Sequence, residues 1–213
     1  MSEVLEEAKQ SILSHPRGEL ILPIRRQVFK MLGKYELNSN KQIVIQSSGQ
    51  KRRARLQIAC ANHVVYIWNE ALPDDKRIEE LLIKIEDCLN GKFDSRSLRR
   101  IYKELWIDCD NLGSHSNNKI ILASYVGYAT ICTAVTTCTD EPLVGDYIEE
   151  GAFDDDLDPY EWDASYYASM AYVGKPTWEE QDEANVNKRR EFWTWYITKA
   201  VPEAYAAFSD DEE

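Results

Sequence analysis

The chain has 213 residues, of which 44% are hydrophobic and 29% are charged, and its net charge is −12 at pH 7. This composition is ordinary for a globular protein and excludes a disordered chain, a collagen and a small disulfide framework. The charge is divided unevenly, since residues 1–106 carry 19 basic and 14 acidic side chains whereas residues 107–213 carry 6 and 23. The acidic second half opposes nucleic-acid binding, which needs a dominant positive field.

The first half of the chain has apolar residues at intervals of three and four, the spacing of one helix face. This spacing predicts helices over 3–13, from Pro23 onward, over about 51–71, from the Pro73–Asp75 turn to Gly91, and from a cap at Asp94 or Ser95. Residues 35–50 are ambiguous, because they fit either a short β element near 42–46 or a buried loop.

Residues 120–138 carry no charged side chain and approach the length of a membrane span. Their Ser, Thr and Tyr residues favour a central helix that is buried on most sides, with a strand over 130–139 as the alternative. Residues 140–156 are expected to form a loop. Helices over 159–172 and about 177–200 follow, and Pro202 is expected to kink or end the last one.

The sequence therefore predicts an all-α fold, a single-domain bundle of about seven to eight helices over residues 1–208, followed by an acidic disordered tail at 209–213. The N-terminal ten residues are acidic and lack an apolar run, so we expect no signal peptide and a cytoplasmic location without membrane association. The five cysteines are widely spaced and form no Cys-x-x-Cys pair, which predicts buried free thiols in a reducing cytosol.

Metal-binding patterns are weak in this sequence. The three histidines lie in different segments, and none forms the i, i+3 or i, i+4 pair that a helical zinc or di-iron site needs. Asp154, Asp156 and Asp158 match the start of a calcium loop, but Pro159 occupies the position of the required glycine and Ser165 that of the bidentate glutamate. We therefore expect no metal and no cofactor.

Catalytic patterns are equally weak, so no enzymatic activity is expected. The chain has no Gly-x-Ser-x-Gly motif and no Gly-x-Gly phosphate loop. An enzyme of unrecognised type would need His63, Cys60 or Cys109 to meet carboxylates in a pocket. Basic residues cluster at 51–55, at 26–34 and at 96–103; they are interpreted as solvated helix faces or as docking faces for the protein's own acidic half.

An acidic-aromatic tract between Asp140 and Tyr167 is the most distinctive feature of the chain. Acidic residues steer a basic partner and set specificity, while Tyr and Trp supply the buried anchors of interface hot spots. The alternative is a solvated acidic loop whose aromatic residues join the core. The predicted partner-binding residues are Asp146, Tyr147, Glu149, Glu150, Asp154, Asp155, Asp156, Asp158, Tyr160, Glu161, Trp162 and Asp163.

The segment from Arg52 to Lys92 resembles a known family. It has an Arg-x-Leu run rich in Ala and Cys, then Ile67-Trp68-Asn69-Glu70, a Pro73-Asp74 turn and a leucine helix that ends at Gly91. This pattern is similar to an all-α immunity protein family of bacterial polymorphic toxin systems, the fifth numbered immunity family. The similarity extends loosely to about residue 140, and the chain beyond Asp140 does not align.

The resemblance implies a non-enzymatic protein that binds and neutralises a cognate toxin domain made by the same cell. The acidic tract suits a basic partner such as a nuclease, because clustered carboxylates can stand in for phosphate charge. The alternative is a structural or regulatory adaptor that oligomerises through charge-complementary faces, its positive half docking on a neighbour's negative half.

Overall fold

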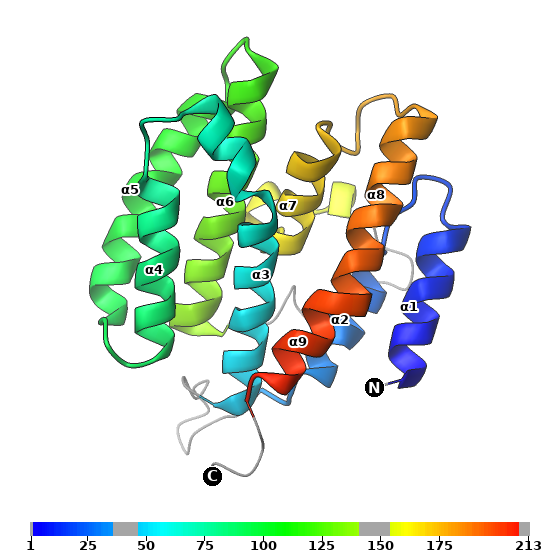
Figure 1. Cartoon of the computed structure of the whole chain (residues 1–213), viewed down its shortest axis with the longest axis horizontal. Helices are drawn as coiled ribbons and strands as arrows, with labels where there is room; N and C mark the ends of the chain where they lie inside the picture. The colour runs from blue at the N-terminus through cyan, green and yellow to red at the C-terminus, as the bar shows by residue number, and fades with distance from the viewer. Residues whose placement is uncertain (1, 36–46, 141–153, 209–213) are drawn as a thin grey trace.

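The computed structural model describes residues 2–35, 47–140 and 154–208, and these residues form helices and loops with no strand (Figure 1). The fold is an all-α single domain, as predicted. The α-helices are α1 (Ser2–Ser14), α2 (Leu22–Met31), α3 (Ser48–Ala71), α4 (Arg77–Leu89), α5 (Ser95–Gly113), α6 (Asn118–Thr139), α7 (Ala164–Val173), α8 (Glu183–Trp195) and α9 (Val201–Ala206). Two short 3₁₀-helices, η1 (Asp154–Asp156) and η2 (Pro159–Glu161), precede α7, and a π-helix, η3 (Tyr196–Ala200), joins α8 to α9.

Helix α6 is the centre of the bundle and packs against α3, α4, α5 and α7. It is the one helix within the described ranges that is long and apolar enough to cross a membrane, by length and composition only, and 61% of its most apolar window is buried inside the fold. This burial confirms the predicted central helix, and the alternative of a strand over 130–139 is wrong. Small residues permit the close packing, as Ala123, Gly127 and Ala134 are all buried.

Helices α3, α5 and α6 begin where a short polar side chain accepts hydrogen bonds from the first backbone N–H groups. Asp94 accepts from the N–H groups of Arg96 and Ser97 and so begins α5, which settles the choice between Asp94 and Ser95. Asn117 caps α6 in the same way, accepting from the N–H of Lys119. Local sequence therefore fixes the starts of these three helices, whereas α2 and α4 begin without a side-chain cap.

The predicted helix over 159–172 is wrong at its start, because two successive caps divide it. Asp158 caps only the single turn of η2, with Pro159 in its first position. Trp162 then has extended backbone torsions, and Asp163 caps the N-terminus of α7. Helix α7 ends at Gly174 in the left-handed region, at φ +84°, as the glycine there predicts.

The last predicted helix begins six residues later than expected and continues beyond its expected end. Asp182 and Asn185 form a reciprocal capping box, so α8 starts at Glu183 rather than at Thr177. Pro202 does not end the helix, because the π-helical turn of η3 leads into α9 with Pro202 in its first turn. If α8, η3 and α9 are counted as one helix, the described residues form eight helices besides the two short 3₁₀-helices.

Some predictions fall outside the described residues. The possible β element near 42–46, most of the loop over 140–156 and the acidic tail at 209–213 belong to this group. The prediction of buried free thiols holds for Cys60, Cys88, Cys109 and Cys138, while Cys132 is half-buried and also free.

Gly127 in α6 tests the close packing at the centre of the bundle. A Cβ atom at this position would lie well inside van der Waals contact of Cys109 Sγ from α5. We expect Gly127→Ala to lower the free energy of unfolding by about 1–3 kcal/mol, the usual cost of overpacking a core. Urea denaturation followed by circular dichroism measures this loss.

Gly113→Ala serves as the matched control, because a Cβ there meets only the Ser124 side chain, whose Oγ lies at an ordinary 3.4 Å. The added Cys109→Ala substitution removes the clashing sulfur, so the double variant should lose less stability than the two single losses combined. Additive losses would show that Gly127 is not required by the Cys109 contact.

Candidate partner-binding surface

The acidic-aromatic tract divides into an inner and an outer part. Asp146, Tyr147, Glu149 and Glu150 lie outside the described residues. Of the other eight predicted residues, Asp154, Trp162 and Asp163 are buried. The exposed members are Asp155, Asp156, Asp158, Tyr160 and Glu161.

Asp154 and Asp163 are bound inside the protein by one arginine. Arg25 of α2 is only 1% exposed, and its Nη1 donates to Asp154 Oδ2 at 2.8 Å while its Nη2 donates to Asp163 Oδ2 at 2.8 Å and to the second oxygen of Asp154. Burial alone would lower the pKa of the guanidinium, but the two carboxylates outweigh it and raise the pKa. These two carboxylates face Arg25 rather than solvent, so we remove them from the residues proposed to contact a partner.

Asp155 is also held from inside, although its side chain is partly exposed. Its Oδ1 accepts hydrogen bonds from Tyr166 Oη and Thr177 Oγ1, each at 2.6 Å, and its Oδ2 pairs with Arg17 Nη1 at 2.9 Å. Burial acts to raise the pKa of Asp155, but these donors outweigh it and hold the pKa below its ordinary value. The carboxylate is therefore charged, and most of its hydrogen-bonding capacity is used within the fold.

Two large aromatic side chains are exposed here, Tyr160 within the tract and Trp178 beyond its end. Tyr160 is 70% exposed and stacks on Trp106 of α5, with 5.4 Å between ring centroids. Trp178, in the loop before α8, is 53% exposed and stacks on the buried Trp162 at 5.6 Å. The prediction missed Trp178, which lies eleven residues after the end of the tract in the sequence but contacts the tract in the fold.

A row of inner rings supports both exposed aromatic residues. Tyr128 of α6 and Tyr167 of α7 stack at 5.0 Å, and Trp162 meets Tyr167 edge-on at 5.4 Å. Tyr128 Oη donates to the carboxylate of Asp110 at the end of α5, and burial together with this bond raises the pKa of Tyr128. Because Tyr160 stacks on the half-buried Trp106 and Trp178 on the buried Trp162, both exposed rings are positioned by the fold before any partner binds. We call Asp156, Asp158, Tyr160, Glu161 and Trp178 the exposed acidic-aromatic surface.

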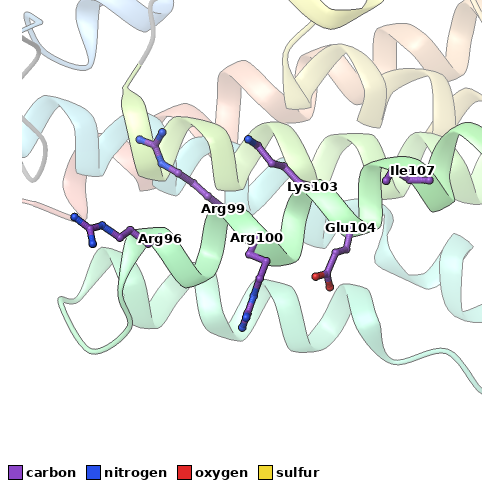
Figure 2. Close-up of a pocket in the computed structure, with 6 residues that line it drawn as sticks. All are labelled: Arg96, Arg99, Arg100, Lys103, Glu104 and Ile107. Carbon is purple, nitrogen blue, oxygen red and sulfur yellow. The ribbon is translucent and has the colours of Figure 1, made fainter.

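The basic clusters differ in burial and in the groups that they contact. Arg53 of α3 is fully buried, and its Nε and Nη2 donate to Asp140 at 2.8 and 2.5 Å. Arg53 thus binds the protein's own acidic half, as does Arg25. The cluster at 96–103 is instead exposed and lines a shallow groove of about 390 Å³ along α5 (Figure 2).

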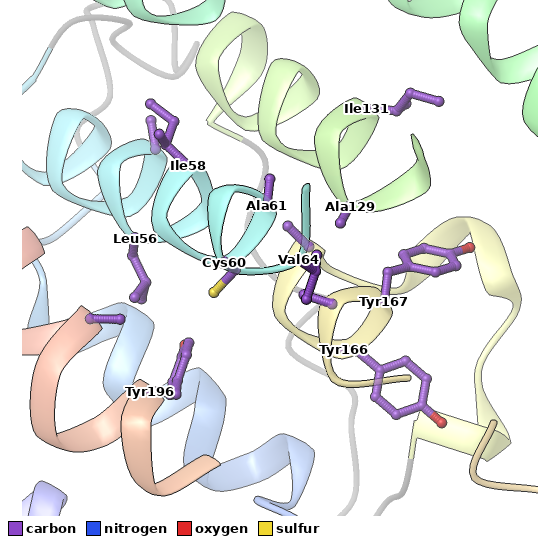
Figure 3. Close-up of a cluster of buried hydrophobic side chains, with 14 of the residues drawn as sticks. Leu56, Ile58, Cys60, Ala61, Val64, Ala129, Ile131, Tyr166, Tyr167 and Tyr196 are labelled. Carbon is purple, nitrogen blue, oxygen red and sulfur yellow. The ribbon is translucent and has the colours of Figure 1, made fainter. Parts of the chain in front are cut away.

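The segment that resembles the family, from Arg52 to Lys92, contributes many side chains to the hydrophobic core. Leu56, Cys60 and Val64 of α3 point into a buried cluster that includes Tyr166 of α7 and Tyr196 of η3 (Figure 3). No group of three His, Cys, Asp or Glu side chains suited to a metal ion occurs within the residues that the structure describes.

A family model described as Immunity protein Imm5 matches residues 5–203. The chain belongs to this immunity protein family. The match confirms the resemblance and extends it beyond Asp140, into the segment that the sequence pattern alone left unaligned. A search of curated proteins found no match. In this immunity protein, the family region therefore includes both Arg25 and the exposed acidic-aromatic surface.

Substitution of Arg25 tests whether its ion pairs with Asp154 and Asp163 stabilise the fold. Arg25→Met leaves two buried carboxylates without their cation, and breaking a buried pair in this way costs about 3–5 kcal/mol of folding free energy. Urea denaturation measures the loss. Arg77→Met is the control, because Arg77 pairs with Asp75 and Asp108 at the surface, where ion pairs contribute about 1 kcal/mol or less. Similar losses for both variants would contradict a structural role of Arg25.

The buried carboxyl of Glu19, beside Arg17 and Arg189, predicts a pH dependence of the free energy of unfolding. Glu19 is buried, its Oε2 pairs with Arg17 Nη2 at 3.1 Å, and its Oε1 has no hydrogen-bond partner. Burial raises the pKa of Glu19 to about 7, against the opposing effect of Arg17 and Arg189. The folded state therefore binds the Glu19 proton more tightly than the unfolded state, and stability falls as the pH rises from the ordinary pKa to about 7.

Glu19→Gln removes this titration, so the variant should gain stability relative to the wild type as the pH rises through that window. The difference should reach on the order of 3 kcal/mol at pH 8 and be small at pH 4, by linkage. Urea unfolding of both proteins across this pH range measures it. If the difference in free energy of unfolding between the two proteins does not change with pH, the raised pKa of Glu19 is contradicted.

Proposed function

We propose that this immunity protein acts by binding a cognate toxin domain and blocking its activity, without catalysis and without a cofactor. Membership of an immunity protein family supports this proposal. We place the complex in the cytoplasm, where the producing cell needs protection from its own toxin. The toxin is proposed to present a basic site, as a nuclease does.

The observation that carries the proposal is the exposed acidic-aromatic surface. Tyr160 and Trp178 are large, exposed and held by stacking on Trp106 and Trp162. Because these rings are already ordered, binding loses little side-chain entropy, and such rings are the usual hot spots of interfaces.

The carboxylates beside these rings supply the second part of the proposed contact. Asp156, Asp158 and Glu161 are exposed, and they lie within the acidic half of the chain. Carboxylates at the rim of an interface attract a basic partner and speed association, and added salt screens this attraction. The surface therefore combines anchors with electrostatic steering.

The proposal is tested by reading the neighbouring genes for a multidomain protein with a variable C-terminal domain and titrating that candidate toxin domain with this protein. Tyr160→Ala should weaken the complex about tenfold or more, mainly through faster dissociation, because it removes an anchor. Glu161→Lys should slow association, and the effect should shrink at high salt. Surface plasmon resonance at two salt concentrations separates these two rate constants, and co-expression with the toxin reports protection of the cell.

Glu203→Lys on α9 is the matched control, since Glu203 is exposed and lies outside the surface. It should leave both rate constants within about twofold of the wild type. Unchanged affinity in Tyr160→Ala and Glu161→Lys together with intact protection would reject this surface but keep the immunity function. No binding to the neighbouring toxin domain would reject the function itself.

A further inference from the structure

Helix α5 carries opposite charges at the two ends of its exposed face. Its N-terminal half presents the basic stripe, defined as Arg96, Arg99, Arg100 and Lys103, which are all exposed and line the groove in Figure 2. Within the part of the chain that the structure describes, no carboxylate pairs with Arg96, Arg100 or Lys103. Because these side chains are exposed, an external anion or an acidic surface can reach them.

The C-terminal half of the same helix is joined to the exposed acidic-aromatic surface. Trp106 stacks with Tyr160 of η2, and Asp110 accepts the hydrogen bond of Tyr128. Asp158 and Glu161 flank Tyr160 in the chain and are exposed. One face of the molecule thus runs from cationic to anionic along α5, and the exposed Ile107, at 65%, lies between the two parts.

We propose that two copies of the chain associate through this face, with the two α5 helices antiparallel about a two-fold axis. The antiparallel arrangement places the basic stripe of each copy against the acidic-aromatic surface of the other, so each favourable contact occurs twice. A parallel arrangement would instead oppose like charges. Ile107 lies near the axis and gives the contact an apolar centre.

Charge complementarity favours a second copy over a polyanion as the occupant. A nucleic acid on the basic stripe would also face the adjacent carboxylates and a chain of net charge −12. A second copy supplies carboxylates for the stripe and cations for the acidic-aromatic surface at the same time. This inference holds without a toxin; if the proposed function is also correct, the toxin and the second copy compete for the same surface.

Sedimentation equilibrium of the isolated chain tests self-association directly. We expect a monomer–dimer equilibrium at about 50 mM NaCl that weakens about tenfold or more at about 500 mM, where the Debye length is only a few ångströms. A species that stays monomeric at low salt up to about 100 µM would overturn the proposal, because that limits the dissociation constant to values too weak for a specific interface.

Charge-reversed variants distinguish this face from general electrostatic attraction. Arg96→Glu/Arg100→Glu and Asp158→Lys/Glu161→Lys should each be monomeric alone, because each opposes like charges across the axis. Mixed together, they should form a heterodimer, because both contacts regain opposite charges. Circular dichroism melts establish that each variant is folded.

Lys188→Glu/Lys199→Glu is the matched control, because both lysines are exposed and lie in α8 and η3, away from α5. This variant should dimerise like the wild type. An equal loss of dimer in the control, or a mixture of reversed variants that stays monomeric, would overturn the antiparallel α5 interface. Since no toxin is present, these outcomes leave the proposed function untouched.

Discussion

The ion pairs between Arg25 and the carboxylates of Asp154 and Asp163 organise the part of the molecule that carries the candidate surface. The arginine lies 129 and 138 residues from its partners, so it connects α2 to the segment that enters α7. A buried charge is tolerated only when it is paired and hydrogen-bonded, and each of these three groups needs the others. By fixing Asp154 and Asp163, Arg25 fixes both ends of the η1–η2 segment, and Tyr160 is thereby presented to solvent.

The structure explains part of the unequal distribution of charge along the sequence. Some positive charge of the first half is used internally, since Arg25 and Arg53 are buried against Asp154, Asp163 and Asp140. The remaining charge is separated on the surface, with the basic stripe at one end of α5 and acidic residues at the other. Both interpretations that the sequence left open for its basic clusters are therefore realised, at different residues.

Local rules predicted the helices of the bundle well because apolar spacing and caps are local signals. They failed where two candidate caps compete, as with Asp158 and Asp163, and where a cap lies inside a predicted helix, as with Asp182. The burial of Asp154 could not be predicted, because an aspartate among other acidic residues resembles a solvated one until its distant cation is known. Trp178 was missed for the same reason: its stacking partner is defined by tertiary structure.

We propose that the exposed part of the acidic-aromatic tract contacts the partner, whereas the part bound by Arg25 is structural. Hydrogen–deuterium exchange of the chain, with and without the cognate toxin domain, tests this claim most directly. The account predicts added protection in peptides that contain Asp156–Glu161 and Trp178, with little change in the already buried start of α7. Protection confined to other elements, such as the turn between α3 and α4, would contradict it.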